Sequence, residues 1–199
     1  MSVPIVLASG STVRALMLKN AGVPFSVETA RIDEDAITAS LRSEGATPRD
    51  VADTLAEMKA RKVSERCPGC MVLGCDQVLD LDGQLMSKPK TPEKALKQLL
   101  ALRGTRHTLL SAAVIYENGE PQWRHVGRVE MTTRHLSQDY LSGYVTRNWE
   151  STRETVGGYK VEEEGVRLFA RIDGDYFDVL GMPLLPLLDY LIVRGVLES

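Results

Sequence analysis

The feature that most constrains the fold is a repeated change between short apolar runs and segments of helical periodicity. The apolar runs Val3–Ala8 and Met71–Gly74 predict buried strands. Apolar residues recur at helical spacing over Pro48–Arg66, and Pro183–Arg194 predicts an apolar closing helix. This alternation predicts an α/β or mixed-sheet fold with no obvious linker.

Two dipeptides add tight hairpins to this pattern. Asp82-Gly83 and Asn118-Gly119 are the residue pairs that two-residue β-turns prefer. Further helices are predicted over Thr91–Gly104, with Pro in the first turn, and from Ser137 to about Asn148. The remaining predicted strands are Phe25–Glu28 and Val166–Ile172. Because hairpins join antiparallel strands, we expect a mixed, twisted sheet with flanking helices.

Length and charge limit the partners that such a fold can serve. The 199 residues suit a single domain spanning 1–199, or two small lobes that share a cleft. Lys and Arg total 24 against 27 Asp and Glu, which gives a formal net charge of −3. A protein that binds long nucleic acid usually carries a basic surplus, so we expect no nucleic-acid polymer as its main partner.

Membrane and secreted classes are also disfavoured. No stretch approaches the ~20 apolar residues that cross a bilayer, and the N-terminus lacks the basic leader of a secretory signal. Three cysteines, an odd number, argue against a disulfide framework. We therefore expect a cytoplasmic protein without a membrane partner.

The Cys67-Pro68-Gly69-Cys70 motif favours a turn with incidental thiols. A redox CxxC normally follows a strand and opens a helix, whereas here a predicted helix precedes the motif and a strand follows it. A zinc site would need four ligands, and only Cys75 and scattered histidines remain.

The loop after the first predicted strand is a candidate phosphate site. Ser9-Gly10-Ser11-Thr12 leads into a helix, whose first N–H groups can bind an anion, and Arg14 follows one turn later. An ordinary helix start capped by Ser11 or Thr12 explains the same residues.

Three further side chains are candidates with equally plain alternatives. Asp76 follows an apolar run, where the end of a buried strand in an α/β sheet carries ligand chemistry or simply caps a turn. Lys59 lies beside the buried stripe of its helix, where a snorkelling stem explains its position as well as a role in a site. Lys88, held by Pro89, is either a site residue or solvated.

Considered together, six short segments are more specific than any one of them. In chain order they are LASGSxxR (Leu7–Arg14), the acidic loop residues Asp33-Glu34, LAEMKA (Leu55–Ala60), GCDQV (Gly74–Val78), SKP (Ser87–Pro89) and GMPL (Gly181–Leu184). This set resembles the Maf family of nucleoside triphosphate pyrophosphatases, also known as septum formation proteins, over nearly the whole chain.

The resemblance implies two lobes around a deep nucleotide-binding cleft, a homodimer, and hydrolysis of a nucleoside triphosphate to the monophosphate and pyrophosphate with a divalent cation, Mg²⁺ or Mn²⁺. It also implies the clearance of modified nucleotides and a link to septum formation. The site roles that it implies are phosphate binding by Ser9, Ser11 and Arg14, metal binding or water activation by Glu34 and Asp76, with Asp76 as the base, and neutralisation of the triphosphate by Lys59 and Lys88.

The base preference follows from three positions. Gln77 after Asp76, and Glu162 in a later segment, resemble the family branch that prefers 7-methyl-GTP, and a carboxylate can accept from the guanine N1–H and N2–H₂ groups. Val13 stands where that branch has a Trp, so the stacking partner would have to come from elsewhere, such as Trp149 or Tyr159. The alternatives are a dTTP/UTP pyrophosphatase and a non-catalytic nucleotide-binding regulator of cell division.

Overall fold

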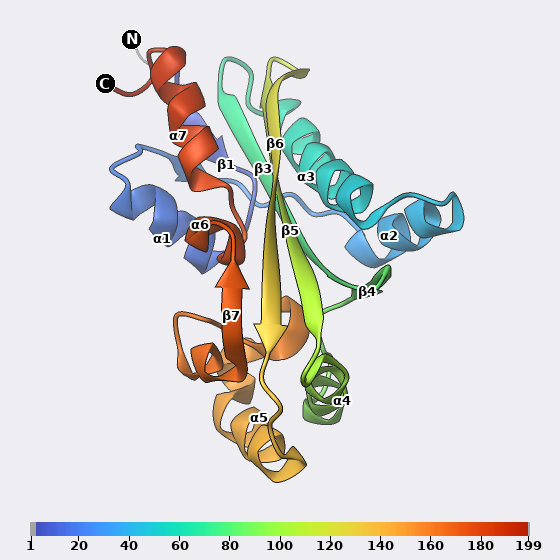
Figure 1. The fold of residues 1–199 in the computed structure, drawn as a ribbon. Coiled ribbons are helices and arrows are strands. Elements are labelled where there is room, and N and C mark those ends of the chain that lie inside the picture. The colour runs from blue at the N-terminus through green and yellow to red at the C-terminus, as the bar shows by residue number, and fades with distance from the viewer. Residues whose placement is uncertain (1–2, 199) are drawn as a thin grey trace.

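The computed structural model describes residues 3–198, and over this range the chain forms a seven-stranded sheet with helices around it (Figure 1). The strands are β1 Ile5–Leu7, β2 Ser26–Val27, β3 Met71–Leu81, β4 Gln84–Met86, β5 Arg106–Glu117, β6 Glu120–Thr133 and β7 Phe169–Asp173. The helices are α1 Thr12–Asn20, α2 Glu34–Ser43, α3 Pro48–Ser64, α4 Pro92–Leu102, α5 Gln138–Thr152, α6 Tyr176–Val179 and α7 Leu184–Val193, with two 3₁₀ turns, η1 Val156–Gly158 and η2 Glu164–Leu168.

The sheet is mixed, as predicted. Its order is β2-β1-β3-β5-β6-β7, and β4 pairs with β3 off this path. β1 runs parallel to both β2 and β3, whereas β3, β5, β6 and β7 pair in antiparallel fashion. The predicted α/β class with a mixed sheet and flanking helices is therefore confirmed.

Both predicted hairpins are present. Asp82 and Gly83 join β3 to β4 with φ angles of 50° and 83°, and Asn118 and Gly119 join β5 to β6 with φ angles of 53° and 82°. A turn in which both central residues have positive φ matches the right-handed twist of the strands it joins. The dipeptides thus fix where the short β3–β4 pair and the long β5–β6 pair begin.

Three helices begin at the predicted caps. The side chains of Ser11, Thr91 and Ser137 accept from backbone N–H groups at the starts of α1, α4 and α5. The prediction was wrong for Leu16 and Val166. Leu16, expected on the buried face of α1, is exposed, and Val166, expected in a strand, lies in η2 before β7 begins at Phe169.

The acidic loop predicted at Asp33-Glu34-Asp35 is instead the start of a helix. Asp33 caps α2 by accepting from the Ala36 N–H at 3.0 Å, and Glu34 and Asp35 lie in its first turn. Acidic side chains there are favoured by the positive end of the helix dipole. Glu34 is consequently held on a regular element rather than on a loop.

Asp76 lies inside its strand, so the prediction that it follows the end of a strand was wrong. β3 continues to Leu81, because the antiparallel ladder with β5 runs from Met71 to Asp80. The parallel pairing with β1 stops at Leu73, so Asp76 lies just beyond the carboxyl end of β1. An open sheet edge at that point gives the side chain access to a cavity.

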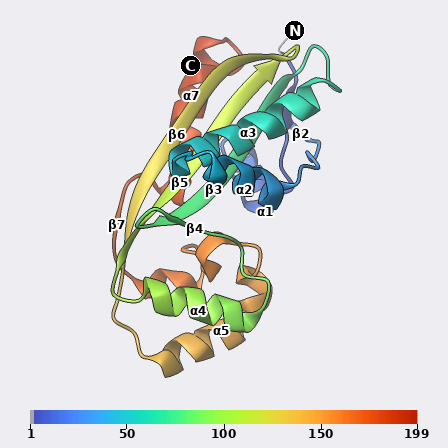
Figure 2. The ribbon, with the colours of Figure 1, turned by 90° about the vertical axis from the view of Figure 1, so that its right-hand side faces the viewer.

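The core is divided along the sheet. One group of buried residues joins α4 and α5 to the far parts of the long strands, and other groups lie under α1, α3 and α7. Figure 2 shows α4 and α5 gathered at one end, away from α1, α2 and α3. The single domain over 1–199 and its division into two lobes stay predictions.

The cysteine motif forms the predicted turn between α3 and β3. The Cys70 N–H donates to the Cys67 carbonyl at 3.2 Å, and Gly69 has a φ of 74°. Both thiols are free, and burial together with nearby Glu28 raises the pKa of Cys67, which opposes thiolate formation. None of the helices within residues 3–198 is both long and apolar enough to span a membrane.

Candidate active site

A cavity of about 910 Å³ is lined by residues from both ends of the sheet. Every predicted site residue except Ser9 lines it: Ser11, Val13, Arg14, Glu34, Lys59, Asp76, Gln77, Lys88 and Glu162. These residues come from α1, α2, α3 and β3, and from the connecting segments that hold Ser11, Lys88 and Glu162. The structure thus brings together side chains of which the sequence showed only the order along the chain.

Lys59 joins two carboxylates at the centre of this wall. Its Nζ atom lies 2.7 Å from Glu34 Oε1 and 2.6 Å from Asp76 Oδ1. The Lys59 and Asp76 side chains are each 8% exposed, and that of Glu34 is 42% exposed. We refer to Glu34, Lys59 and Asp76 as the carboxylate–lysine cluster.

The two carboxylates of this cluster titrate differently because they are buried to different depths. Burial raises the pKa of Asp76, against the opposing charges of Lys59 and Arg14. Partial burial also acts to raise the pKa of Glu34, but Lys59, with Lys88 and Arg14, outweighs it and the pKa lies below the ordinary value. A carboxylate with a raised pKa is better suited to accept a proton.

Close packing of α3 on β3 places Lys59 next to Asp76. At Gly74, a Cβ atom would lie 2.2 Å from the Ala56 carbonyl oxygen and 2.6 Å from the Ala60 nitrogen. Glycine therefore allows the helix backbone to touch the strand two residues before Asp76. Lys59 also belongs to the buried face of α3, whereas Met58, predicted to be on that face, is 38% exposed.

Arg14 is held firmly at the cavity wall. Its Nε donates to the Gly181 carbonyl at 2.8 Å, and its Nη1 donates to the Cys75 carbonyl at 3.1 Å and to Ser9 Oγ at 3.3 Å. The Ser11 N–H also donates to Ser9 Oγ. Ser9 therefore lies behind Arg14 and orients it, while Ser11 and Arg14 face the cavity.

The amide nitrogen of Gln77 is used in contacts within the protein. Its Nε2 lies within hydrogen-bond distance of Ser111 Oγ at 3.0 Å and of the Asp178 and Val179 carbonyls at 2.9 and 3.1 Å. These contacts tie β3 to α6. Only the Oε1 end of the side chain is left for a ligand, so Gln77 is at most an acceptor towards a base.

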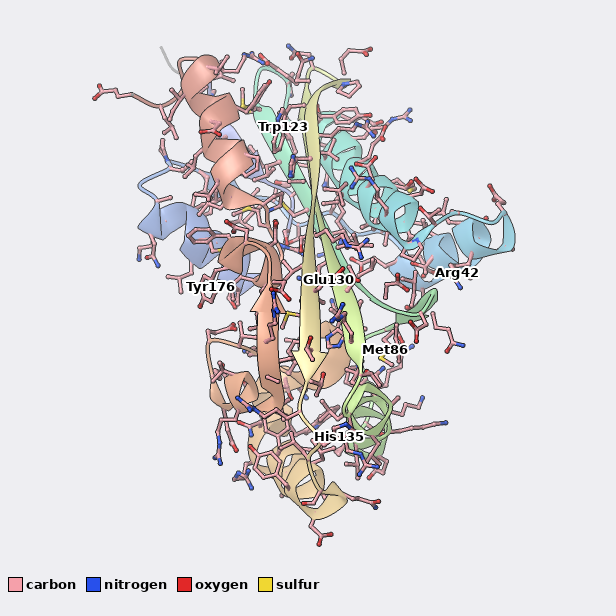
Figure 3. All side chains as sticks on the ribbon, viewed as in Figure 1. Arg42, Met86, Trp123, Glu130, His135 and Tyr176 are labelled. Carbon is pink, nitrogen blue, oxygen red and sulfur yellow. The ribbon has the colours of Figure 1, made fainter. Side chains whose placement is uncertain are left out.

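Two of the predicted substrate-binding residues lie where the large cavity meets a second one. Glu162 is exposed, and both it and Val13 also line a second, apolar cavity of about 560 Å³ between α1, α6 and α7. In the view of Figure 3, Met86 of the large cavity and Tyr176 of the second lie on opposite sides of β6. Glu162 is thus at the boundary of the two cavities.

Aromatic side chains do line the large cavity. Trp149 is half-buried at the end of α5, and Tyr159 is buried with its hydroxyl 2.8 Å from His107 Nε2. The same wall includes three residues that were not expected there from the sequence, Arg153, Glu154 and Thr155. Their segment departs from the family motifs, so nothing in the sequence alone indicated that these residues line a site.

The donors present suit a divalent cation only in part. Glu34 and Asp76 converge on one point, now filled by the Lys59 ammonium, and carboxylate oxygens are the ligands that Mg²⁺ prefers. Among residues 3–198, no group of three or more His, Cys, Asp or Glu side chains is placed to hold a metal. Two carboxylates fit a cation that takes its other ligands from substrate phosphates and water.

A mixed α/β fold with a buried carboxylate, cations and a large cavity defines a candidate enzyme acting on a phosphorylated ligand. The chain belongs to the Maf-like protein family, whose model matches residues 4–193.

Relatives with curated names match over nearly their full length. The chain is 63% identical to a protein of Ruegeria pomeroyi named nucleoside triphosphate pyrophosphatase, over 100% of both chains. It is 48% identical to a protein of Brucella abortus named 7-methyl-GTP pyrophosphatase, over 94% of both chains. A solved structure, a HAM1 protein from Coxiella burnetii, is 18% identical, with a TM-score of 0.48 over 67% of this chain and 74% of that one.

Proposed function

We propose that this protein hydrolyses a nucleoside triphosphate to the nucleoside monophosphate and pyrophosphate. The observation that carries the proposal is the carboxylate–lysine cluster, in which a buried Asp76 faces a cavity of about 910 Å³ together with Arg14 and Lys88. A cavity of this size suits a nucleotide. The full-length relative named nucleoside triphosphate pyrophosphatase supports the same activity.

In this mechanism Asp76 takes a proton from a water molecule as the water oxygen attacks the α-phosphorus. The bond between the α-phosphorus and the oxygen that bridges to the β-phosphorus breaks, and pyrophosphate leaves with that oxygen. Negative charge grows on the phosphate oxygens as this happens. Arg14, Lys59 and Lys88 supply the positive charge that stabilises it.

A divalent cation, Mg²⁺ or Mn²⁺, would be held by Glu34 and Asp76, and when bound it would withdraw charge from the phosphate oxygens. Removal of divalent cations with a chelator should abolish pyrophosphate release, and added Mg²⁺ or Mn²⁺ should restore it. Full activity after exhaustive chelation would contradict this part of the proposal.

We propose 7-methyl-GTP as the preferred substrate. Glu162, at the cavity wall, can accept from the guanine N1–H and N2–H₂ groups, and its charge favours the positive charge that N7 methylation creates. Uracil or thymine would present carbonyl oxygens to it, and these cannot donate to a carboxylate. Trp149, on the same wall, is the aromatic surface available to stack on the base.

The experiment is a pyrophosphate-release assay over the canonical nucleoside triphosphates and 7-methyl-GTP, with Asp76→Asn as the matched variant. We expect 7-methyl-GTP to have the highest kcat/KM, and Asp76→Asn to lower it by about 10²–10⁴-fold because the general base is lost. A preference for dTTP and UTP would refute the base assignment. Failure of the wild type to hydrolyse any of them would favour a nucleotide-binding regulator.

The resemblance to the family also suggests a homodimer as the functional state. Sedimentation velocity of the purified chain tests this directly. A species of twice the 22.0 kDa chain mass is expected, and a monomer at all concentrations would refute it.

A further inference from the structure

The Lys59 ammonium lies at the one point where the two carboxylates of the cluster meet. Its contacts with Glu34 Oε1 and Asp76 Oδ1, at 2.7 and 2.6 Å, are both short. With 8% of its side chain exposed, Lys59 has little freedom to leave this position in the free protein. It is a single positive charge placed between two acceptors that would otherwise repel each other.

We infer that Lys59 occupies the cation position of the site until a nucleotide arrives, so that the divalent cation and the triphosphate bind together rather than in sequence. This inference rests on the proposed function. Lys59 holds the carboxylates close together and balances one of their two charges, and in doing so it competes with a divalent cation for the same oxygens.

The hydrogen-bond donors of the ammonium group explain how Lys59 can leave the two carboxylates when a triphosphate binds. Lys59 has three N–H donors, of which the contacts with Glu34 and Asp76 use two. The charged phosphate oxygens of an arriving triphosphate offer this group other acceptors in the same cavity. As Lys59 turns towards them, both carboxylates become available to the cation that the nucleotide carries.

The position of Lys59 in the helix explains why it is held there without a nucleotide. It follows Leu55 by four residues on the face of α3 that packs on β3, and Gly74 permits the close approach of the two backbones. The charged Lys59 side chain is thus buried on the packed face of the helix. Two carboxylates on other elements, α2 and β3, are the groups that compensate for the buried charge.

The test is a titration with Mn²⁺ alone, without nucleotide, followed by the electron paramagnetic resonance signal of the free ion. Lys59→Met removes the ammonium at nearly constant volume, and Lys88→Met is the matched control. Lys88 carries the same charge into the same cavity, but the two short carboxylate contacts belong to Lys59. The double variant Lys59→Met/Asp76→Asn reports whether Mn²⁺ binds at the cluster.

We expect Lys59→Met to bind Mn²⁺ at least about tenfold more tightly than the wild type, a change of about 1.4 kcal/mol. Lys88→Met should change the affinity by less than about threefold, and the double variant should lose the gain. Equal Mn²⁺ affinities for Lys59→Met and the wild type, or for Lys59→Met and Lys88→Met, would overturn the inference.

Two provisions keep the test decisive. Folding of each variant is checked by circular dichroism, and Lys59→Gln replaces Lys59→Met should the latter not fold. Should neither variant fold, the Mn²⁺ titration is made with the wild type and Asp76→Asn. We expect similarly weak Mn²⁺ binding by both, and tight binding by the wild type that Asp76→Asn abolishes would overturn the inference.

Because no nucleotide is present, this result is independent of hydrolysis. Absence of pyrophosphate release by the wild type would refute the proposed function, whereas the Mn²⁺ titration would still report whether Lys59 holds the cation position.

Discussion

At Asp76, burial and an ion pair act on the same carboxyl group in opposite directions. Burial favours the protonated form, whereas Lys59 at 2.6 Å and Arg14 favour the charged form. Burial prevails, so the pKa of Asp76 lies above the ordinary value of 3.8. The residue is therefore a stronger proton acceptor than an exposed aspartate would be.

This gives a prediction for the dependence of activity on pH. The base form of Asp76 is lost as pH falls through its raised pKa, so kcat/KM should decline at a pH above the range expected for an ordinary aspartate. The measurement is the kcat/KM profile for the best nucleotide, with circular dichroism at each pH to separate unfolding from titration. An acid limb at or below pH 3.8 in folded protein would contradict the role of Asp76.

A second prediction at this scale concerns the base. Glu162→Gln removes the charge that favours 7-methylguanine and keeps the size of the side chain. The ratio of kcat/KM for 7-methyl-GTP to that for UTP should fall by about 10–100-fold, which corresponds to ~1–3 kcal/mol. Glu163→Gln is the control, because Glu163 is engaged by Ser151 and Lys160 and does not line the large cavity. An unchanged ratio for Glu162→Gln would exclude Glu162 from base recognition.

Single residues differ in how far the sequence could assign them. Asp76, Lys59 and Arg14 could be selected because motifs in a fixed order surround them. Their partners could not, since Lys59 meets Glu34 from another helix and Arg14 donates to carbonyls of Cys75 and Gly181. Such contacts depend on how distant segments pack, which short motifs do not encode.

Among the elements, α3 and β3 together position the cluster. The buried face of α3 lies directly on β3 at Gly74, where the helix backbone leaves no room for a side chain. Lys59 and Asp76 come within ion-pair distance because of this contact. The packing of one helix on one strand therefore determines the geometry of the site.

Gly74→Ala tests this dependence. The added Cβ would meet backbone atoms of Ala56 and Ala60, which must move, so we expect a loss of about 1–3 kcal/mol in the free energy of unfolding. Pyrophosphate release should fall with it, because Lys59 is displaced from Asp76. Denaturant unfolding and the activity assay measure the two effects.

The matched control is Gly143→Ala in α5. There the nearest atom to the new Cβ is the flexible end of Arg147, and alanine favours a helix, so stability should be unchanged or higher. Equal stabilities of Gly74→Ala and the wild type would show that α3 and β3 do not need this close contact.

Elements with local signals were predicted well from the sequence. Capping residues located the starts of α1, α4 and α5, and Asp-Gly and Asn-Gly located both hairpins. The failures were α2, which has no buried residue to mark it, and the continuation of β3 past Asp76. That continuation is set by the ladder with β5, a pairing between distant segments.

For the whole molecule, charge is distributed unevenly around a near-neutral total. The formal net charge is −3, yet Arg14, Lys59 and Lys88 face one cavity together with Glu34 and Asp76. A few cations suffice for one triphosphate, whereas a long polyanion needs a continuous basic surface. The large cavity is the feature of the whole fold that lets these charged side chains face one bound ligand.

A binding experiment follows from this distribution of charge. In gel-shift assays at physiological salt, neither duplex DNA nor single-stranded RNA should be retained, even at tens of micromolar protein, about the range of non-specific binders. Addition of 7-methyl-GTP as a competitor should not change this result. Retention of either polymer with a steep salt dependence would show a basic surface that the charge balance does not predict.

The most direct test of the account is to locate the attacked phosphorus by hydrolysis in water enriched in ¹⁸O. In the proposed mechanism the water that Asp76 deprotonates attacks the α-phosphorus, so the heavy oxygen should appear in the nucleoside monophosphate and not in pyrophosphate when both are examined by mass spectrometry. Label in the pyrophosphate, or release of a nucleoside diphosphate and phosphate, would contradict it.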